Sequence, residues 1–190
     1  EIVSGIEGSP VHVAGSGRTD AGVHAEAQVA AFTLTNPIPP DNLRRAINRL
    51  LPPAIRVFNV EEVGAGFHPR FDSVAKTYRY TLHRSEIVPP RDARYVHHHP
   101  YPLREDWMLE AAARFVGEMD FRTFAAKDDR YDQGQSTVRT IFSSGLHRDG
   151  DRLIYTVRGS GFLKHMVRNI VGTLLECGRG NLPHNVLPRK

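Results

Sequence analysis

The stretch Gly15–His24 places three glycines, an arginine, an aspartate and a histidine between two short apolar runs. The runs, residues 11–14 and 28–34, are typical of strands, so the stretch between them is a loop whose glycines permit unusual backbone angles. Loops held by rigid elements often carry chemistry. Three interpretations compete: a tight turn capped by Asp20, a phosphate-binding loop, and an active-site carboxylate kept ionised by Arg18 or another arginine.

The phosphate-binding interpretation is the weakest of the three. Nucleotide fingerprints need a different glycine spacing and a helix directly after the loop, and Asp20 would repel a phosphate. The loop by itself leaves the structural turn and the active-site carboxylate open.

Composition narrows the class of protein. The chain has 190 residues, 40% of them hydrophobic, and a formal charge of +4, which suits a globular protein and favours an acidic partner such as nucleic acid. Cys177 is the single cysteine, so the chain can form no internal disulfide, and a cysteine-based metal site is nearly excluded. A reducing compartment fits this, and we expect a cytoplasmic protein with no membrane segment.

Periodicity and turn signals predict the remaining elements. We expect a helix that begins at an Asp41 N-cap and ends at Pro52, a mobile charged loop over 127–135, and a hairpin turn at Asp149-Gly150. The other predicted strands are 55–63, 74–82, 136–146 and 153–158, and the other predicted helices are 103–119 and 162–176.

Two groups of aromatic side chains admit more than one interpretation. Tyr78 and Tyr80 share one face of the predicted strand 74–82, where they either pack in the core or form a stacking platform for bases. We assign packing to one of them and leave the other open. The run His97–His99 lacks partners at metal-ligand spacing, so we expect a solvated loop there and no metal.

Arg168 stands at the edge of the apolar stripe of the predicted helix 162–176. An arginine in such a place either extends its side chain to solvent or pairs with a buried carboxylate. Asp20 is the candidate partner.

Several motifs together resemble the TruA-type tRNA pseudouridine synthases. The stretch Gly17–Ala25, continued by Gln28, resembles the catalytic loop of that family, and residues 67–71 with 76–80 resemble its second motif. Weaker markers lie at 117–121 and 138–141, and residues 162–172 are similar to its last block. The motifs run in family order from about Gly15 to Gly180.

The resemblance implies an α+β protein with the pseudouridine synthase fold. Two α/β lobes, residues 1–84 and 85–190, would share an antiparallel sheet flanked by helices, with a basic cleft between the lobes. Little precedes Val11 and the chain stops soon after the last glycines, so we expect the first and last elements of that fold to be incomplete. Missing edge strands would leave sheet edges exposed.

The resemblance also implies a reaction and a site. Uridine in the anticodon stem-loop of tRNA (family positions 38–40) would become pseudouridine, in a homodimer without cofactor, nucleotide or metal. Asp20 would be the catalytic carboxylate, Tyr78 would lie against the target base, and Arg168 would pair with Asp20. The expected RNA contacts are Arg18, His24, Gln28, Arg79 and Lys164.

The chemistry agrees with these residue types. A stacked uridine cannot be reached, so it must be flipped out of the helix. The carboxylate then acts as a nucleophile or takes a proton from the sugar, and either route needs its ionised form. Two alternatives are a non-catalytic RNA-binding module on the same scaffold and an unrelated phosphate-ester enzyme, but the latter would need a metal or nucleotide site that the sequence does not supply.

Overall fold

The chain folds into two units with separate interiors, Glu1–Ser73 and Val74–Lys190. The computed structural model describes residues 1–183, apart from the side chains of residues 130 and 132, so the end of the predicted second lobe, 184–190, lies outside the described residues. Strand β3 (Lys76–His83) belongs to the second unit because its ladder partner is β7 (Arg152–Gly159). The predicted lobe boundary after residue 84 concerns the family's fold and stays a prediction.

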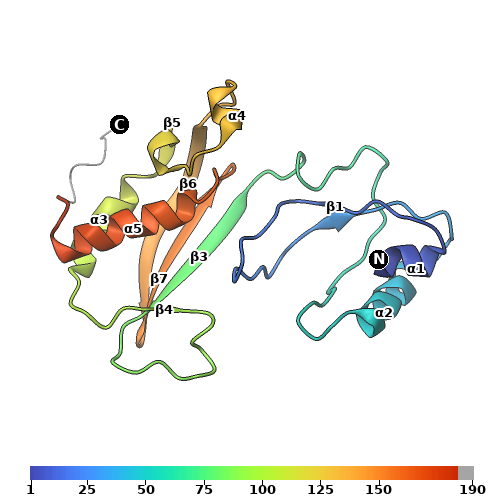
Figure 1. Ribbon diagram of the computed structural model, residues 1–190, viewed down its shortest axis with the longest axis horizontal. Coiled ribbons are helices and arrows are strands. Elements are labelled where there is room, and N and C mark those ends of the chain that lie inside the picture. Colours follow the sequence, from blue (N-terminus) through green and yellow to red (C-terminus); the bar gives the residue numbers. More distant parts are fainter. Residues whose placement is uncertain (184–190) are drawn as a thin grey trace. The chain divides into compact units, whose positions relative to one another are not determined.

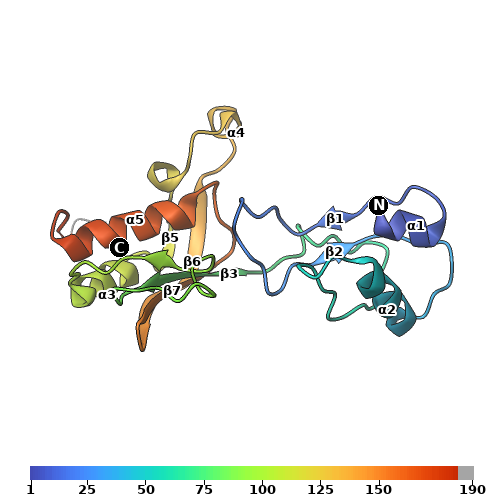
Figure 2. The same ribbon diagram turned by 60° about the horizontal axis from the view of Figure 1, so that its bottom comes forward.

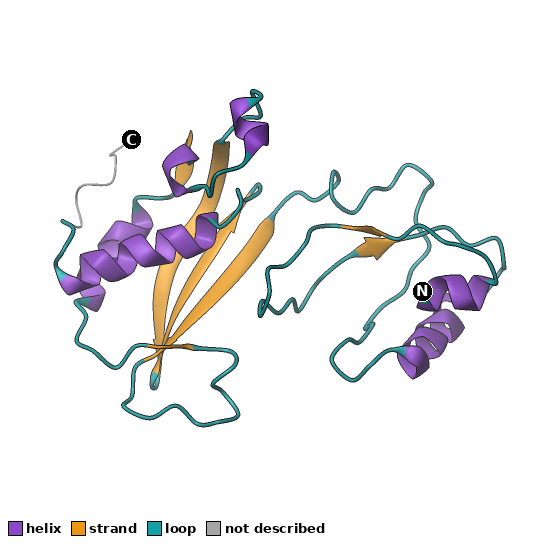
Figure 3. Cartoon of the chain, viewed as in Figure 1, coloured by secondary structure: helices purple, strands orange, loops and turns teal. Residues whose placement is uncertain are grey.

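The first unit consists of two helices, one minimal strand pair and long loops (Figures 1 and 3). Helix α1 (Ile2–Glu7) ends at Gly8, which has a φ of 81°, and helix α2 (Pro40–Leu50) buries Leu43 and Ile47. Strands β1 (Ala14–Gly15) and β2 (Ala30–Ala31) pair antiparallel on either side of the Asp20 loop. The strand–loop–strand prediction is therefore confirmed, although the ladder is shorter than the apolar runs.

Two predictions for the first unit are wrong. Asp41 lies inside the first turn of α2, because Pro40 already occupies the start of the helix and Pro39 is the N-cap. Residues 55–63 form no strand and belong to neither described sheet. The main chain of Val57 instead bonds the side chain of Asn48 on α2. Asn48 Nδ2 donates to the carbonyl of Val57, and the N–H of Val57 donates to Asn48 Oδ1, both at 2.8 Å.

The second unit is built on a five-stranded sheet in the order β4-β3-β7-β6-β5. Its remaining strands are β4 (His97–His98), β5 (Gly117–Asp120) and β6 (Val138–Asp149). All neighbours are antiparallel except β3 and β4. The predicted hairpin at Asp149-Gly150 is confirmed: Asp149 pairs with Arg152, and Gly150 has a φ of 52°.

Helices α3 (Glu105–Ala113) and α5 (Met166–Arg179) cover one face of this sheet. Figures 1 and 2 show α5 running across the strands as a separate layer. The sheet contributes every second residue of its central strands, because alternate side chains point to the same face. The core includes Leu82, Leu153, Tyr155 and Val157 from the strands, Met108, Ala112 and Phe115 from α3 and its end, and Met166, Ile170 and Leu174 from α5.

Two helix boundaries and one loop in the second unit differ from the prediction. The sequence predicts a helix over 103–119, but α3 ends at Ala113. Gly117, with a φ of 119°, begins strand β5. Helix α5 begins at Met166 because His165 adopts the left-handed region with a φ of 60°. The loop expected over 127–135 contains a short helix, α4 (Asp129–Asp132), which follows a 3-10 turn, η1 (Arg122–Phe124).

The α+β class is confirmed by the mostly antiparallel sheet and its two covering helices. Among the described residues, no helix is long and apolar enough to cross a membrane.

Candidate active site

Asp20 lies in a tight turn within the glycine-rich loop. Its carbonyl accepts the N–H of Val23 at 3.0 Å, and Gly22, the third residue of the turn, has a φ of 78°. A positive φ at this position is the mark of a type II turn and is accessible to glycine without strain. Asp20 is exposed, so the turn is made by its main chain while its carboxylate is carried on the loop surface.

Gln28 closes the base of the same loop. Its Oε1 accepts the hydroxyl of Ser16 at 2.8 Å, and its Nε2 donates to the carbonyl of Gly17. The N–H of Ser16 also donates to the carbonyl of Val29 at 2.9 Å. Gln28 was predicted as an RNA contact, and that role stays a prediction. In the structure, Gln28 also holds the two ends of the loop together. The sequence did not indicate this, because hydrogen bonds between side chains about twelve residues apart leave no periodic pattern.

Tyr78 and Tyr80 both point to the helix-covered face of β3 and pack at the edge of the core. The ring of Tyr78 meets Phe162 edge to face, with centroids 4.9 Å apart. The hydroxyl of Tyr80 lies 2.9 Å from His97 Nδ1. Both tyrosines are half-buried, so each combines packing with a partly open ring.

Arg168 occupies the first turn of α5 and is exposed, while its neighbours Met166 and Ile170 are buried. Its charge reaches Tyr80: burial raises the pKa of Tyr80, and Arg168 opposes that rise by stabilising the phenolate. Arg168 therefore lies on the tyrosine side of the second unit. Lys164, just before the helix, is also exposed, and its carbonyl accepts the N–H of Ala126 at 2.9 Å.

The predicted site residues fall into two groups. Arg18, Asp20, His24 and Gln28 share the exposed loop of the first unit. The second group, in the second unit, is Tyr78, Arg79, Lys164 and Arg168. Tyr78 lies on the helix-covered face of β3, whereas Arg79 alternates with it and lies on the opposite face. The site roles and the pairing of Asp20 with Arg168 stay predictions.

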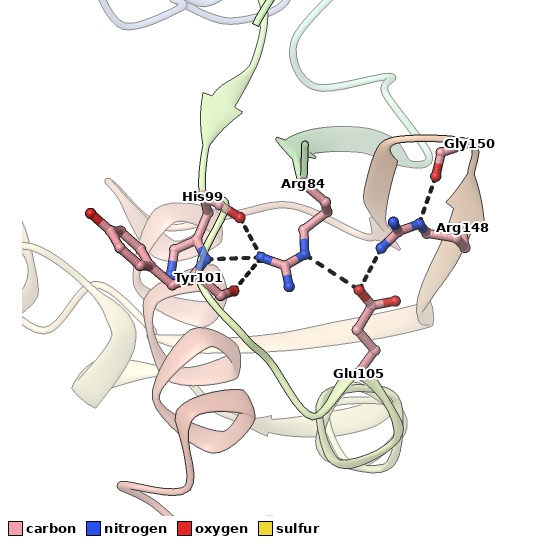
Figure 4. A network of polar contacts seen from close by, with 6 residues as sticks. All are labelled: Arg84, His99, Tyr101, Glu105, Arg148 and Gly150. Atoms are coloured by element: carbon pink, nitrogen blue, oxygen red, sulfur yellow. Dashed lines mark hydrogen bonds and ion pairs between the residues drawn. The ribbon is translucent and has the colours of Figure 1, made fainter. Parts of the chain in front are cut away.

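The expectation of a solvated loop at His97–His99 is wrong as to the loop and as to His99, although His97 and His98 are exposed as expected. His97 and His98 form strand β4, and His99 is 2% exposed. Arg84 Nη1 lies 3.0 Å from His99 Nδ1, and Arg179 Nη2 lies 3.0 Å from its Nε2 (Figure 4 shows the Arg84 side). Burial, then Arg179, then Arg84 lower the pKa of His99, because a protonated ring would face guanidinium donors on both sides.

Arg84 connects this histidine to the start of α3. It donates to the carbonyls of His99 and Tyr101, and its Nε lies 3.4 Å from Glu105 Oε1 (Figure 4). The same carboxylate oxygen accepts from Arg148 Nη1 at 2.6 Å. This network ties β3, α3 and the β6–β7 hairpin together, and its members are too far apart in sequence for any local pattern to reveal it.

A family model described as tRNA pseudouridine synthase matches residues 2–72 and 111–190. These ranges include the Asp20 loop and the whole of helix α5, and they cover well over half of the chain. The chain belongs to the tRNA pseudouridine synthase family. The recognition made from the sequence motifs is thereby confirmed.

Individual members of the family are similar to this chain over most or all of its length. The tRNA pseudouridine synthase A of Solibacter usitatus (strain Ellin6076) is 66% identical over 191 residues, which span 100% of this chain and 80% of the relative. The protein of the same name from Brevibacillus brevis is 43% identical over 175 residues, 92% of this chain and 70% of the relative. That of Geobacter sulfurreducens is 43% identical over 173 residues, 91% and 70% of the two chains.

Proposed function

We propose that this chain is an isomerase that converts uridine to pseudouridine in the anticodon stem-loop of tRNA. The observation that carries the proposal is the family match, which includes both the Asp20 loop and the Arg168 helix. Relatives named tRNA pseudouridine synthase A cover nearly the whole chain at up to 66% identity, which supports tRNA as the substrate.

Asp20 is the catalytic carboxylate in this proposal. The target nucleotide is flipped out of the stem, the C1′–N1 bond breaks, the uracil rotates, and C5 bonds to C1′. The proton of C5 is then lost and N1 carries a proton, so the product is an isomer of the substrate. An exposed carboxylate on a glycine-rich turn can approach the sugar of a flipped nucleotide, as a nucleophile or as a base.

Tyr78 and Arg168 complete the catalytic group. Tyr78 is half-buried and braced by Phe162, so its ring is held in one orientation and can lie against the detached uracil. Arg168 pairs with Asp20 and favours the ionised carboxylate that both routes require. No oxidation or reduction occurs in this isomerisation, so the reaction needs no redox cofactor.

The remaining predicted residues bind RNA in this proposal. Arg18 helps to extrude the target nucleotide, and the other contacts come from His24, Gln28, Arg79 and Lys164. The two lobes of the family fold enclose a basic cleft for the anticodon arm, and the enzyme acts as a homodimer in the cytoplasm.

Mapping of the product tests the proposal. An unmodified tRNA transcript with uridines in its anticodon stem is incubated with the chain, and pseudouridine is located by carbodiimide labelling and primer extension. New stops in the anticodon arm are expected. Stops confined to other arms would contradict the proposed specificity, and tRNA binding without any stop would indicate the RNA-binding module instead.

A further inference from the structure

The face of the second-unit sheet opposite α3 and α5 has its own pattern, which the active-site assignment does not use. The register of β3, β7 and β6 places two cross-strand rows next to each other on this face. The rows are Thr77–Arg158–Ser143 and Arg79–Thr156–Gly145. Each row contains one arginine, and its other members are small or hydroxyl-bearing. We call these two rows, together with Phe142, the open face.

Phe142 is the aromatic member of the open face. The ladder between β6 and β7 shifts between Ile141 and Ser143, which makes Phe142 the extra residue of a bulge. Its side chain is 44% exposed, and the guanidinium carbon of Arg158 lies 5.3 Å from its ring centroid. Arg158 is also exposed, and no described carboxylate side chain forms an ion pair with it.

Acidic residues lie at the margins of this face. Glu118 is on the edge strand β5, where it accepts from the Thr140 hydroxyl at 3.3 Å, and Asp149 is at the hairpin. Arg152, near the same hairpin, is already engaged by Asp92 at 2.9 Å. A carboxylate therefore engages Arg152 near the hairpin end, whereas among the described residues none forms an ion pair with Arg158 in the middle of the sheet.

We propose that the open face is a second RNA-contacting surface, which takes the sugar-phosphate backbone of tRNA on Arg158 and Arg79 and an unpaired base on Phe142. Sheets recognise single-stranded RNA in this way, with aromatic side chains stacking on bases and arginines and hydroxyls contacting phosphates. A symmetric second copy is a poorer fit, because it would bring the same arginines towards each other. The inference rests on the proposed function for the identity of the RNA.

Gly145 offers a sharp test of this surface. A Cβ added there meets nothing within 4 Å, and its φ lies outside the positive range that strains other residues, so Gly145→Glu adds a carboxylate to the Arg79 row without a clash. We expect tRNA affinity to fall about three- to tenfold at moderate salt because the added charge repels phosphate. Gly145→Ala and the charge-matched Ala113→Glu, on exposed α3 surface, should bind as the wild type does.

Arg158→Gln and Phe142→Ala test the two contacts separately by filter binding at several salt concentrations. Arg158→Gln should reduce the slope of log affinity against log salt by about 1, whereas Phe142→Ala should weaken binding with little change in slope. Arg104→Gln, an exposed arginine on the helix side, is the matched control. At saturating tRNA the single-turnover rate should stay near the wild-type value, so the defect appears in KM.

Wild-type affinity and salt slope in both Gly145→Glu and Arg158→Gln would overturn the proposal. So would a fall in sedimentation coefficient for Gly145→Glu with unchanged tRNA affinity, because the face would then be a contact between copies. Failure of the proposed function is separate: the wild type would bind tRNA and form no pseudouridine, and the binding comparison could still be made.

Discussion

The two units of this chain hold their shape by different means. In the first unit, Leu43 and Ile47 are the described core residues that are buried, while Phe58 and Phe71 are 80% and 76% exposed. Its Asp20 loop is held by a glycine turn and by the side chain of Gln28. In the second unit, a continuous core joins three strands to α3 and α5. In the proposed function, a locally hydrogen-bonded loop therefore carries the catalytic carboxylate, and the packed unit supplies Tyr78 and Arg168 from rigid elements.

The largest expected effect concerns the loop carboxylate. Asp20→Ala should lower the pseudouridylation rate by more than about 100-fold, while tRNA affinity and thermal stability stay near wild type, because the main-chain bond from the Asp20 carbonyl to Val23 is kept in the variant. Asp41→Ala, which removes an exposed carboxylate of α2, is the control for both readouts. Loss of folding in Asp20→Ala would instead make this a structural aspartate.

Arg168→Leu is the corresponding change in the second unit. It should slow the reaction by about 10- to 100-fold, because in the proposed pairing Arg168 is the cation that orients Asp20 and favours its charged form. The acid limb of the pH–rate profile should move to higher pH, which a purely structural role would not cause. Arg104→Leu, at the N-cap of α3, should leave the rate and the profile unchanged, and a fully active Arg168→Leu would refute the pairing.

Alanine substitutions at glycines test the packing of the second unit and the loop geometry of the first unit separately. A Cβ on Gly159 would lie 2.8 Å from both the Thr140 carbonyl oxygen and Ile141 Cδ1, so Gly159→Ala forces the sheet apart. We expect a loss of about 1–3 kcal/mol in the free energy of unfolding of the second unit, measured by urea denaturation. Gly145→Ala, in the same sheet but with open space around it, is the matched control. Equal stability of the two variants would contradict the packing described for β6 and β7.

Gly22→Ala, in the Asp20 loop, should lower activity and leave the stability of the second unit unchanged. Its added Cβ has open space, but a φ of 78° strains any residue with a side chain, so the turn that presents Asp20 should shift. We expect a several-fold fall in kcat and an unchanged melting temperature for the second unit. Gly15→Ala has the same open surroundings without the positive φ, and its activity should match the wild type. A wild-type rate in Gly22→Ala would show that the turn geometry does not matter for the reaction.

The smallest effect is a pH dependence of the second unit's stability. His97 and His99 have lowered pKa values, mainly because of burial, with Arg179 adding to the effect in both. As pH falls through about 6.5, the unfolded chain takes up protons that the folded chain does not, so stability declines. The melting temperature should fall by a few degrees between pH 7 and 5.5.

His99→Gln should reduce that decline, since a glutamine accepts and donates hydrogen bonds without titrating. The lowered pKa values of Asp120 and Glu176 add a further loss of stability below about pH 4.5, which separates their contribution from that of the histidines. A melting temperature that is flat from pH 7 to 5.5 would contradict the role assigned to buried neutral His99.

Features set by local chemistry could be predicted from the sequence. The Asp149-Gly150 turn, the alternation of Leu153, Tyr155 and Val157, and the apolar stripe of α5 all follow from neighbouring residues. The candidate site residues came from motifs that resemble a known family, and their roles stay predictions. Local patterns could not show that Gly117 starts a strand, because the partner that fixes it is β6.

Predictions failed where distant residues decide the structure. Residues 55–63 have the composition of a strand, but Asn48 takes the main-chain bonds of Val57. The histidine run looked solvated, but Arg84 and Arg179, one before it and one far after it, enclose His99. In both cases a polar side chain from another element is the hydrogen-bond partner, and the periodicity of the sequence does not reveal such a partner.

The proposed catalytic role of Asp20 is tested most directly by measuring binding and turnover of the same tRNA by the 190-residue chain. Uridine-labelled transcript is mixed with excess protein, the bound fraction is read by filter retention, and pseudouridine is quantified by chromatography after nuclease digestion. We expect conversion of target uridine by the wild type and none by Asp20→Ala at an equal bound fraction. Bound tRNA whose uridines remain unchanged in the wild type would contradict it.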